Sequence, residues 1–384
     1  MFSYFTPEHE AFRATVRRFV ESEINPHVEN WEAARLWPAH TLLKKMGDLG
    51  LLGLSYPEQY GGGGVDYWYN VVLLEELGRA DCASVPMGIA VHTDMATPAL
   101  AEFGSEALKR RFLVPAIAGE MVSAIGVSEP DAGSDVAAIR TRAVADGDDY
   151  IINGAKMWIT NGTQADFITL LARTGDERGF RGMSLIIVPT TTPGFSVSRK
   201  LEKLGNHASD TAILTFEDVR VPQTNRIGEE GMGFILQMKQ FQRERLAGSL
   251  TSTAGMEKIV RLTINYTRGR QAFGRPLIDN QYIYFRLAEL LTEIEALRQL
   301  NYHCVRLLVA GEDLTKEVSM AKLKAGRLAR EVADTCLQFH GGMGYVEEYP
   351  MARYFRDARL LSIGGGADEI MLGIIAKYEN ILPK

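Results

Sequence analysis

The chain has 384 residues, of which 46% are apolar and 23% are charged, a balance typical of folded globular proteins and unlike that of disordered or fibrous ones. A chain of this length exceeds what one hydrophobic core usually serves, which predicts two or three domains. The formal net charge of −6 argues against nucleic acid as the main partner, because phosphate binding relies on an excess of positive charge.

The sequence shows no pattern typical of a membrane-spanning helix, a secretory signal peptide or a metal site. The longest uncharged stretch, residues 182–198, contains two prolines and a threonine run, so no membrane-spanning helix is expected. The N-terminal residues lack the basic and apolar regions of a secretory signal, and Cys82, Cys304 and Cys336 form no Cys-x-x-Cys pair. We therefore expect a reducing compartment, the bacterial cytoplasm, or the mitochondrial matrix for a processed eukaryotic form. The histidine spacing predicts no metal site.

The first 120 residues predict an α-helical domain. Apolar residues recur at helical spacing, in Phe12, Val16, Phe19, Val20 and Ile24. A second helix is expected to start at Trp37-Pro38, and a third runs through residues 67–77. The four glycines between them, residues 61–64, favour a plain loop, because they do not follow the Gly-x-Gly-x-x-Gly pattern of a dinucleotide-binding turn.

Residues 121–230 predict a separate β domain. Short β-like runs are separated by Gly, Pro, Asn and Asp, at Ser123–Val127, Tyr150–Ile152, Phe167–Ala172, Ser184–Val188 and Thr211–Phe216. Because no helical pattern lies between them, we expect an antiparallel sandwich or barrel rather than a parallel doubly wound sheet.

Residues 231–384 predict a C-terminal four-helix bundle. One long apolar stripe includes Leu287, Leu290 and Ile294, and a second includes Ala321 and Val332. The fold class is therefore α+β, with the order helices, β domain, helical bundle.

Two segments of the β domain could carry chemistry. Residues 128–135 are rich in hydroxyls and turn formers, and composition alone favours a plain turn. In residues 156–162, Trp158 could stack on a flat ligand while Thr160 hydrogen-bonds the edge of that ligand. A tryptophan that only caps a barrel is the structural alternative.

These two segments, in this order of domains, resemble the acyl-CoA dehydrogenase family. The resemblance extends over essentially the whole chain and continues at residues 266–277, 338–345 and 356–359. It implies a flavoprotein of fatty acid β-oxidation that binds FAD and converts an acyl-CoA thioester to the trans-2-enoyl-CoA. It further implies a homotetramer, arranged as a dimer of dimers, with electron-transfer flavoprotein as the electron acceptor.

The resemblance also assigns residues to the cofactor. In the family, positions matching Val127, Ser128, Gly133, Ser134, Trp158 and Thr160 lie against the flavin or its phosphates, those matching Arg270, Phe273, Gln338, Gly341 and Gly342 reach the FAD of a neighbouring subunit, and Ala367 and Glu369 are further cofactor positions. Arg270 offers a fork of donors suited to a pyrophosphate, although it could also be a solvated cation at a helix end.

The reaction needs a carboxylate base for the α-proton while a hydride leaves the β-carbon for flavin N5. Many family members carry that glutamate in a Tyr-Glu-Gly-Thr segment, but the matching position here is Gly365. A subset, including isovaleryl-CoA and long-chain acyl-CoA dehydrogenases, carries it in a Glu-Arg-Leu segment, and Glu244-Arg245-Leu246 matches that pattern. We therefore expect Glu244 to be the base, with its pKa raised by burial.

Other roles follow from the same match. Gly365 keeps a backbone N–H that could polarise the thioester carbonyl. The expected substrate contacts are Ser134, Phe241, Gln242, Arg245 and Gly365. An exposed Glu244 paired with Arg245 or Lys239 is the structural alternative for the base. Asp368 and Glu369 are rival carboxylates.

The sequence leaves the acyl group open. The Glu-Arg-Leu segment together with residues 363–371 looks most like long-chain and citronellyl-CoA dehydrogenase-like members, so a long or methyl-branched chain is expected. Isovaleryl-CoA, with the same base position, is the alternative substrate. An acyl-CoA oxidase or flavin monooxygenase of the same fold would share these motifs, and so would a non-catalytic flavin- or acyl-CoA-binding module.

Overall fold

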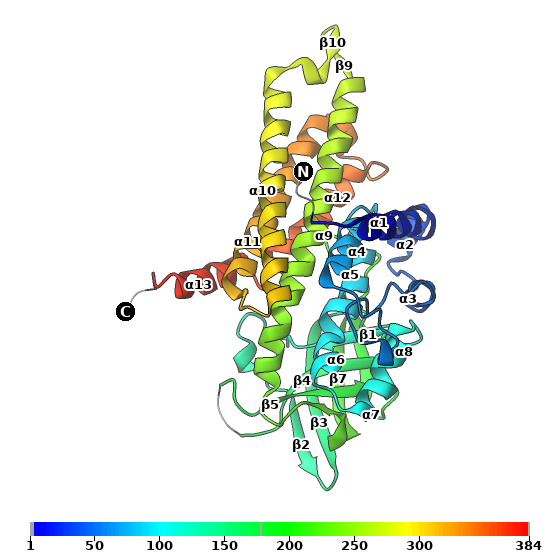
Figure 1. Cartoon of the computed structure of the whole chain (residues 1–384), viewed down its shortest axis with the longest axis vertical. Helices are drawn as coiled ribbons and strands as arrows, with labels where there is room; N and C mark the ends of the chain where they lie inside the picture. Colours follow the sequence, from blue (N-terminus) through cyan, green and yellow to red (C-terminus); the bar gives the residue numbers. More distant parts are fainter. Residues whose placement is uncertain (1–3, 177–178, 383–384) are drawn as a thin grey trace.

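The computed structural model of the chain describes residues 4–176 and 179–382. The first three residues, which contribute to the expectation about a signal segment, lie outside this part. A β-sheet occupies one end of the molecule, long helices extend from it to the other end, and the N-terminal helices pack beside both (Figure 1). The domain limits at residues 120 and 230 stay a prediction.

The N-terminal region is helical, as predicted. Its α-helices are α1 Pro7–Phe19, α2 Val28–Ala34, α3 Ala39–Asp48, α4 Tyr67–Leu77, α5 Ser84–Ala90, α6 Pro98–Phe103, α7 Glu106–Leu108 and α8 Val114–Ile117. Thr6 caps α1 by accepting a hydrogen bond from the His9 N–H, and Asp66 caps α4 by accepting one from the Trp68 N–H. Three π-helical segments, Val20–Ile24, Val91–Ala96 and Lys109–Leu113, interrupt the regular helices.

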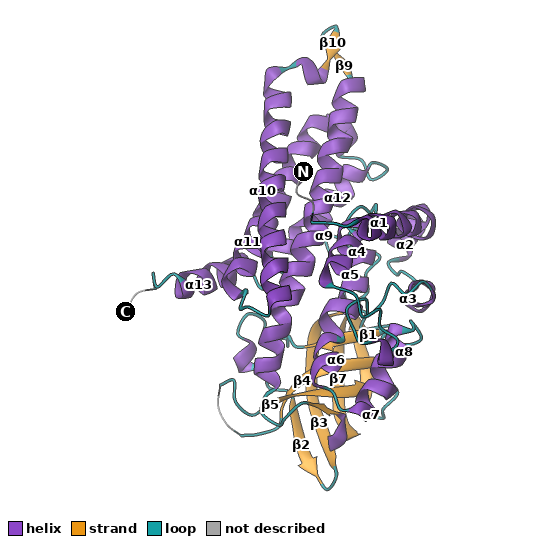
Figure 2. Ribbon diagram, viewed as in Figure 1, coloured by secondary structure: helices purple, strands orange, loops and turns teal. Residues whose placement is uncertain are grey.

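The middle region forms an eight-stranded sheet in the order β6-β7-β3-β2-β4-β5-β8, with β1 paired to β4 (Figure 2). The strands are β1 Ser123–Gly126, β2 Arg142–Asp146, β3 Asp149–Thr160, β4 Phe167–Arg173, β5 Met183–Pro189, β6 Phe195–Lys200, β7 Thr211–Pro222 and β8 Arg226–Ile227. Most pairs are antiparallel, but β1 and β2 each pair parallel with β4, so the sheet is mixed rather than purely antiparallel.

Five of these strands coincide with predicted runs, whereas β2, β6 and β8 were not predicted. In β6 five of the six residues are exposed, and in β2 only Ala143 is buried, so neither strand has the regularly buried face that marks a core strand. In β6 the alternation of apolar and polar residues extends over only four residues, Phe195 to Ser198. β8 has two residues, which is too short for any pattern.

The C-terminal region consists of three long helices, α9 Gly233–Gly269, α10 Gln281–Ala310 and α11 Thr315–His340, with shorter α12 Pro350–Ala358 and α13 Asp368–Tyr378. A small hairpin, β9 Gln271–Ala272 and β10 Arg275–Pro276, joins α9 to α10 at the end far from the sheet (Figure 1). The predicted apolar stripes of α10 and α11 are buried in one core with α9. No helix among the described residues is long and apolar enough to cross a membrane.

Candidate functional site

Glu244 lies in the first third of α9 and is buried, with 8% of its surface exposed. Its Oε1 lies 3.4 Å from Gln237 Nε2, and no ion pair involves it among the described residues. Burial raises the pKa of Glu244 to about 8, against weaker opposing contributions from neighbouring hydrogen bonds and from Arg245. The alternative of an exposed, ion-paired glutamate is therefore wrong. The shifted carboxyl can exchange a proton near neutral pH.

The glycine-rich loop at residues 363–367 is fastened to two helices beside Glu244. Arg245 Nε on α9 donates a hydrogen bond of 3.4 Å to the Gly365 carbonyl, and the buried Lys322 on α11 donates to the Gly366 carbonyl. Gly365 has φ of +65°, and a Cβ atom there would meet nothing within 4 Å. The loop thus needs glycine for its backbone and leaves open space in front of it.

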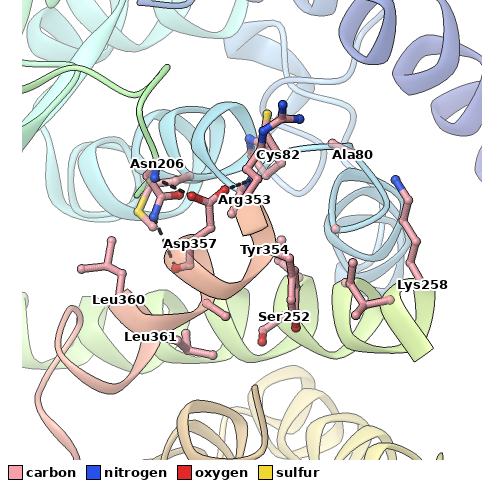
Figure 3. Close-up of a pocket in the computed structure, with 18 of the residues that line it drawn as sticks. Ala80, Cys82, Asn206, Ser252, Lys258, Arg353, Tyr354, Asp357, Leu360 and Leu361 are labelled. Carbon is pink, nitrogen blue, oxygen red and sulfur yellow. Dashed lines mark hydrogen bonds between the residues drawn. The ribbon is translucent and has the colours of Figure 1, made fainter. Parts of the chain in front are cut away.

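A cavity of about 160 Å³ begins one helical turn beyond Glu244. It lies between α9, α12 and the segment from α4 to α5 (Figure 3). The α9 residues that line it are Gly248, Thr251, Ser252, Gly255, Lys258, Ile259 and Leu262, which continue the helical stripe on which Glu244 stands. Leu361, just before the glycine loop, also lines the cavity, so the loop and the cavity are neighbours.

The cations at the far end of this cavity are already paired. Lys258 Nζ lies 2.5 Å from an oxygen of Asp81, and Arg353 Nη2 lies 2.5 Å from an oxygen of Glu29. The rest of the lining is mainly apolar, including Met87. The cavity therefore suits an uncharged chain better than one that ends in a carboxylate.

The structure places only some of the expected substrate-binding residues beside Glu244. The guanidinium of Arg245 lies 5.7 Å from the centre of the Phe241 ring, so these two residues do flank Glu244. Gln242 instead donates a hydrogen bond of 2.6 Å to the Thr315 hydroxyl at the start of α11, on another side of α9. Ser134 lies exposed in the loop after β1, away from α9 in the sequence and in a different region of the fold.

The loop after β1 is held by a buried ion pair that the sequence did not reveal. Lys156 Nζ lies 2.8 Å from a Glu129 oxygen and 2.9 Å from the Val127 carbonyl, and Lys156 is fully buried. The same carboxylate accepts from the backbone N–H groups of Arg140 and Thr141. This network fixes the backbone of the loop on which Ser128, Gly133 and Ser134 stand.

Trp158 is in an unusual position on β3. The pairing of β3 with β7 shifts between Lys156 and Ile159, and Trp158 within this bulge has φ of +65° and is 58% exposed. A bulky residue in the left-handed region carries strain, which is concentrated at functional sites. The bulge turns a flat aromatic side chain out of the sheet, while Thr160, two residues on, is half-buried.

A second group of expected cofactor residues lies at the opposite end of α9. Arg270 caps α9, and Phe273 forms the tip of the β9–β10 hairpin, fully exposed and with φ of +51°. Gln338, Gly341 and Gly342 lie at the end of α11, and a Cβ at either glycine would meet nothing within 4 Å. From Glu244 to Arg270 the helix rises about 39 Å. The hairpin that follows Arg270 lies at the end of the molecule opposite the sheet that contains β3, the strand of Trp158 (Figure 1).

Ala367 and Glu369 lie at the start of α13, where Ala367 is the residue before the first turn and Glu369 is exposed. Asp368, one of the rival carboxylates, is buried and lies 3.4 Å from Arg330. An ion-paired Asp368 is a poorer candidate for a general base than Glu244.

The donors at these positions fit a flavin dinucleotide. Trp158 offers an exposed ring, the hydroxyls of Ser128 and Ser134 and the guanidinium of Arg270 suit phosphate oxygens, and the Gly341–Gly342 segment allows a ligand to approach the backbone. No group of metal-ligating side chains is found in the described part of the chain.

Family models match three consecutive parts of the chain. They are described as the acyl-CoA dehydrogenase N-terminal domain, over residues 6–120, middle domain, over residues 124–219, and C-terminal domain, over residues 231–379. The mitochondrial long-chain specific acyl-CoA dehydrogenase of Sus scrofa is 39% identical, over 97% of this chain and 86% of its own length. The mitochondrial isovaleryl-CoA dehydrogenase of Oryza sativa is 37% identical, over 97% of this chain and 91% of its own.

Solved structures agree with this match. An acyl-CoA dehydrogenase from Geobacillus kaustophilus superposes with a TM-score of 0.95 at 42% identity, covering 99% of this chain and 100% of that one. A chain in the structure titled electron transferring flavoprotein of Acidaminococcus fermentans gives 0.95 at 34% identity, covering 99% of both. A Mycobacterium smegmatis glutaryl-CoA dehydrogenase in complex with FADH2 gives 0.91 at 31% identity, covering 98% of this chain and 95% of that one.

Proposed function

Because the chain belongs to the acyl-CoA dehydrogenase family, whose enzymes depend on FAD, we propose that it dehydrogenates the α,β-bond of acyl-CoA thioesters with a long, uncharged acyl chain, linear or methyl-branched as in citronellyl-CoA. The observation that carries this proposal is the position of the buried Glu244 on the α9 stripe that continues into the apolar cavity.

In this proposal Glu244 takes the α-proton of the thioester. With a pKa of about 8, the Glu244 carboxylate is basic enough to accept the α-proton and acidic enough, once protonated, to release that proton afterwards. Arg245, immediately beside it, links the base to the Gly365 carbonyl and thereby fixes the distance between helix and loop. FAD, when bound, supplies the acceptor for the hydride that leaves the β-carbon.

Gly365 contributes through its backbone. Its N–H has no acceptor within the described residues, so it is available to donate to the thioester oxygen, on which negative charge grows as the α-proton leaves. The absence of a side chain at Gly365 gives room for a carboxylate that approaches from α9 instead of from the loop.

The length of the cavity supports a long acyl chain. From Gly248 to Lys258 the stripe covers about ten residues, or about 15 Å of helix. An extended alkyl chain advances roughly 1.3 Å per carbon, as follows from the carbon–carbon bond length, so this distance corresponds to about 12 carbons. Each methylene buried there contributes about 0.8 kcal/mol, which is roughly fourfold in affinity.

The paired cations support a neutral chain end. A dicarboxylic substrate would need an unpaired cation, and both Lys258 and Arg353 already have acidic partners. Isovaleryl-CoA, the runner-up, would fill only the first turn of the cavity. We expect it to be a poorer substrate than a long chain for this reason.

The assembly and the electron acceptor belong to the same proposal. The two separated groups of cofactor residues support a dimer in which each FAD contacts both chains, and two such dimers would form a tetramer. The chain in the Acidaminococcus structure supports electron-transfer flavoprotein as the acceptor. An oxidase would differ by rapid reaction of its reduced flavin with oxygen.

The test is anaerobic mixing of the FAD-loaded protein with short, long, methyl-branched and dicarboxylic acyl-CoAs, followed by the loss of oxidised flavin absorbance. We expect long and methyl-branched chains to bleach the flavin fastest, and Glu244→Gln to slow the reduction by at least about 10³-fold while binding the same substrates. Reduction of Glu244→Gln at the wild-type rate would refute the assignment of the base, and preference for glutaryl-CoA would refute the assignment of the substrate.

A further inference from the structure

A second buried carboxylate interacts electrostatically with Glu244. Asp94 is in the π-helical segment Val91–Ala96 and is 5% exposed. Gln240 on α9 holds this segment, because its side chain donates to the Met95 carbonyl and accepts a hydrogen bond of 3.0 Å from the Ala99 N–H. Gln240 stands one helical turn before Glu244, so the two carboxylates are anchored through the same stretch of α9.

Asp94 lines a small polar pocket with side chains from three other elements. The pocket has a volume of about 10 Å³ and is lined by Tyr67 and Asn70 of α4, Tyr56 of the preceding loop and Arg243 of α9. Tyr67 Oη and Asn70 Oδ1 are buried and have no hydrogen-bond partner in the described part of the protein. A space of this size with several polar groups around it is just large enough for one water molecule.

The ionisable groups around the pocket influence one another. Among the described residues, the full charges that face Asp94 are Arg243 and Glu244, both on α9, while Tyr56 and Tyr67 face it as neutral phenols whose pKa values are raised by burial. Burial raises the pKa of Asp94 to about 6, against the opposing effects of the Thr93 hydroxyl and of Arg243. Asp94 therefore loses its proton before Glu244 does.

We propose that Asp94 and Arg243, which line one small polar pocket, form a charged cluster near Glu244, in which Asp94 is a positioning residue that disfavours ionisation of the base. This inference rests on the proposed role of Glu244. Neither Asp94 nor Arg243 lines the large cavity, and in this inference Asp94 acts through its electric field at Glu244. The ionised Asp94 repels the Glu244 carboxylate, and the base stays protonated to a higher pH than burial alone would give.

The test compares Asp94→Asn with the wild type in the pH dependence of anaerobic flavin reduction. Loss of the Asp94 charge should lower the pKa of Glu244, so the acidic limb of the profile should move to lower pH by roughly 0.5 units or more. At a pH on that limb, the rate of flavin reduction, expressed as a fraction of the same protein's maximal rate, would then be about threefold higher for the variant than for the wild type. If asparagine prevents folding, Asp94→Ser removes the same charge with a smaller polar side chain.

The matched control is Glu76→Gln, which also converts a buried carboxylate on an N-terminal element to an amide. Glu76→Gln should lower the thermal stability of the protein but should not shift the acidic limb of the pH profile of flavin reduction. The inference would be overturned if both Asp94 variants folded and the acidic limb of their pH profiles stayed where it is in the wild type. If Glu244→Gln were inactive in the same experiment, the proposed function would remain intact. Wild-type reduction by Glu244→Gln would instead remove the proposed function itself.

Discussion

In the proposed function, Glu244 on α9 supplies the carboxylate that many family members carry at the position of Gly365. The glycine has a positive φ and open space at its missing side chain, and the glutamate on α9 stands beside an arginine that reaches the glycine carbonyl. The two residues are therefore structurally linked as well as complementary in their chemistry.

The raised pKa of Glu244 has a consequence for stability. A carboxyl whose folded pKa of about 8 lies above its unfolded value keeps its proton in the folded state after the unfolded chain has released it. Stability contributed by this group is full at acidic pH and is lost as the pH rises from about 4.5 to 8.

We therefore expect the Tm of the wild type to fall relative to that of Glu244→Gln between about pH 5 and about pH 8, because the amide has no proton to lose. Scanning calorimetry or fluorescence of the unliganded proteins at several pH values measures this difference. A Tm difference that is constant across this range would mean that Glu244 titrates normally in the folded state.

Single residues differ in how far the sequence predicts them. Glu244 and Gly365 were identified because they match motifs of the family, in which chemistry restricts residue type and spacing. Asp94 and Lys322 carry no such pattern, since their importance arises from burial against elements distant in the sequence. The direction of the Gln242 side chain, toward Thr315, likewise depends on how α9 and α11 pack.

At the scale of elements, α9 carries Glu244 and one wall of the cavity, so in the proposed function it decides which acyl chain fits. Its glycines at positions 248 and 255 form part of the cavity wall, and a Cβ at Gly248 would lie 3.7 Å from Leu361 Cδ1, at ordinary van der Waals distance. The position thus has room for a side chain, and that side chain would occupy space meant for the substrate.

We expect Gly248→Val to lower kcat/KM for long-chain acyl-CoA by about 10- to 100-fold, while a four-carbon substrate changes by less than about threefold. Stability should not fall, because valine is a better helix former than glycine. Steady-state kinetics over a series of chain lengths checks this. Gly373→Val, in α13 with nothing within 4 Å, is the matched control, and an equal loss at all chain lengths would contradict the expectation.

Helices with a strong apolar period were predicted well, because burial on one face is a local property of the sequence. The β-bulge at Trp158 and the π-helical segments were not, since they depend on pairing with β7 and on packing against other elements. The parallel pairing of β1 with β4 also could not be predicted, because direction is set by the path of the chain between them.

At the scale of the whole molecule, the residues expected to bind the cofactor form two groups, one in the sheet domain and one at the far end of α9 (Figure 1). In the proposed dimer, a complete site combines Glu244 and Trp158 of one chain with Arg270 and Phe273 of the other. A strained, fully exposed phenylalanine at a hairpin tip is explained if it is covered by a second subunit.

Co-expression of Glu244→Gln with Arg270→Ala chains tests this arrangement. Each variant alone should be inactive, the first for lack of a base and the second for weak FAD binding, measured as flavin content. Mixed dimers would contain one intact site, so about a quarter of all sites should recover activity. No recovery in mixed dimers isolated through two affinity tags would mean that each site is built from a single chain.

Helix α9 carries both the proposed base and one wall of the cavity, and this has a consequence for how such enzymes diverge in evolution. Substitutions at the small residues of α9 alter the acyl chain that fits, while Glu244 and the glycine loop stay where they are. Substrate range and reaction chemistry are therefore inherited separately. If the proposed function holds, we expect that after gene duplication changes along this helix would give daughter enzymes that perform the same reaction on different acyl chains.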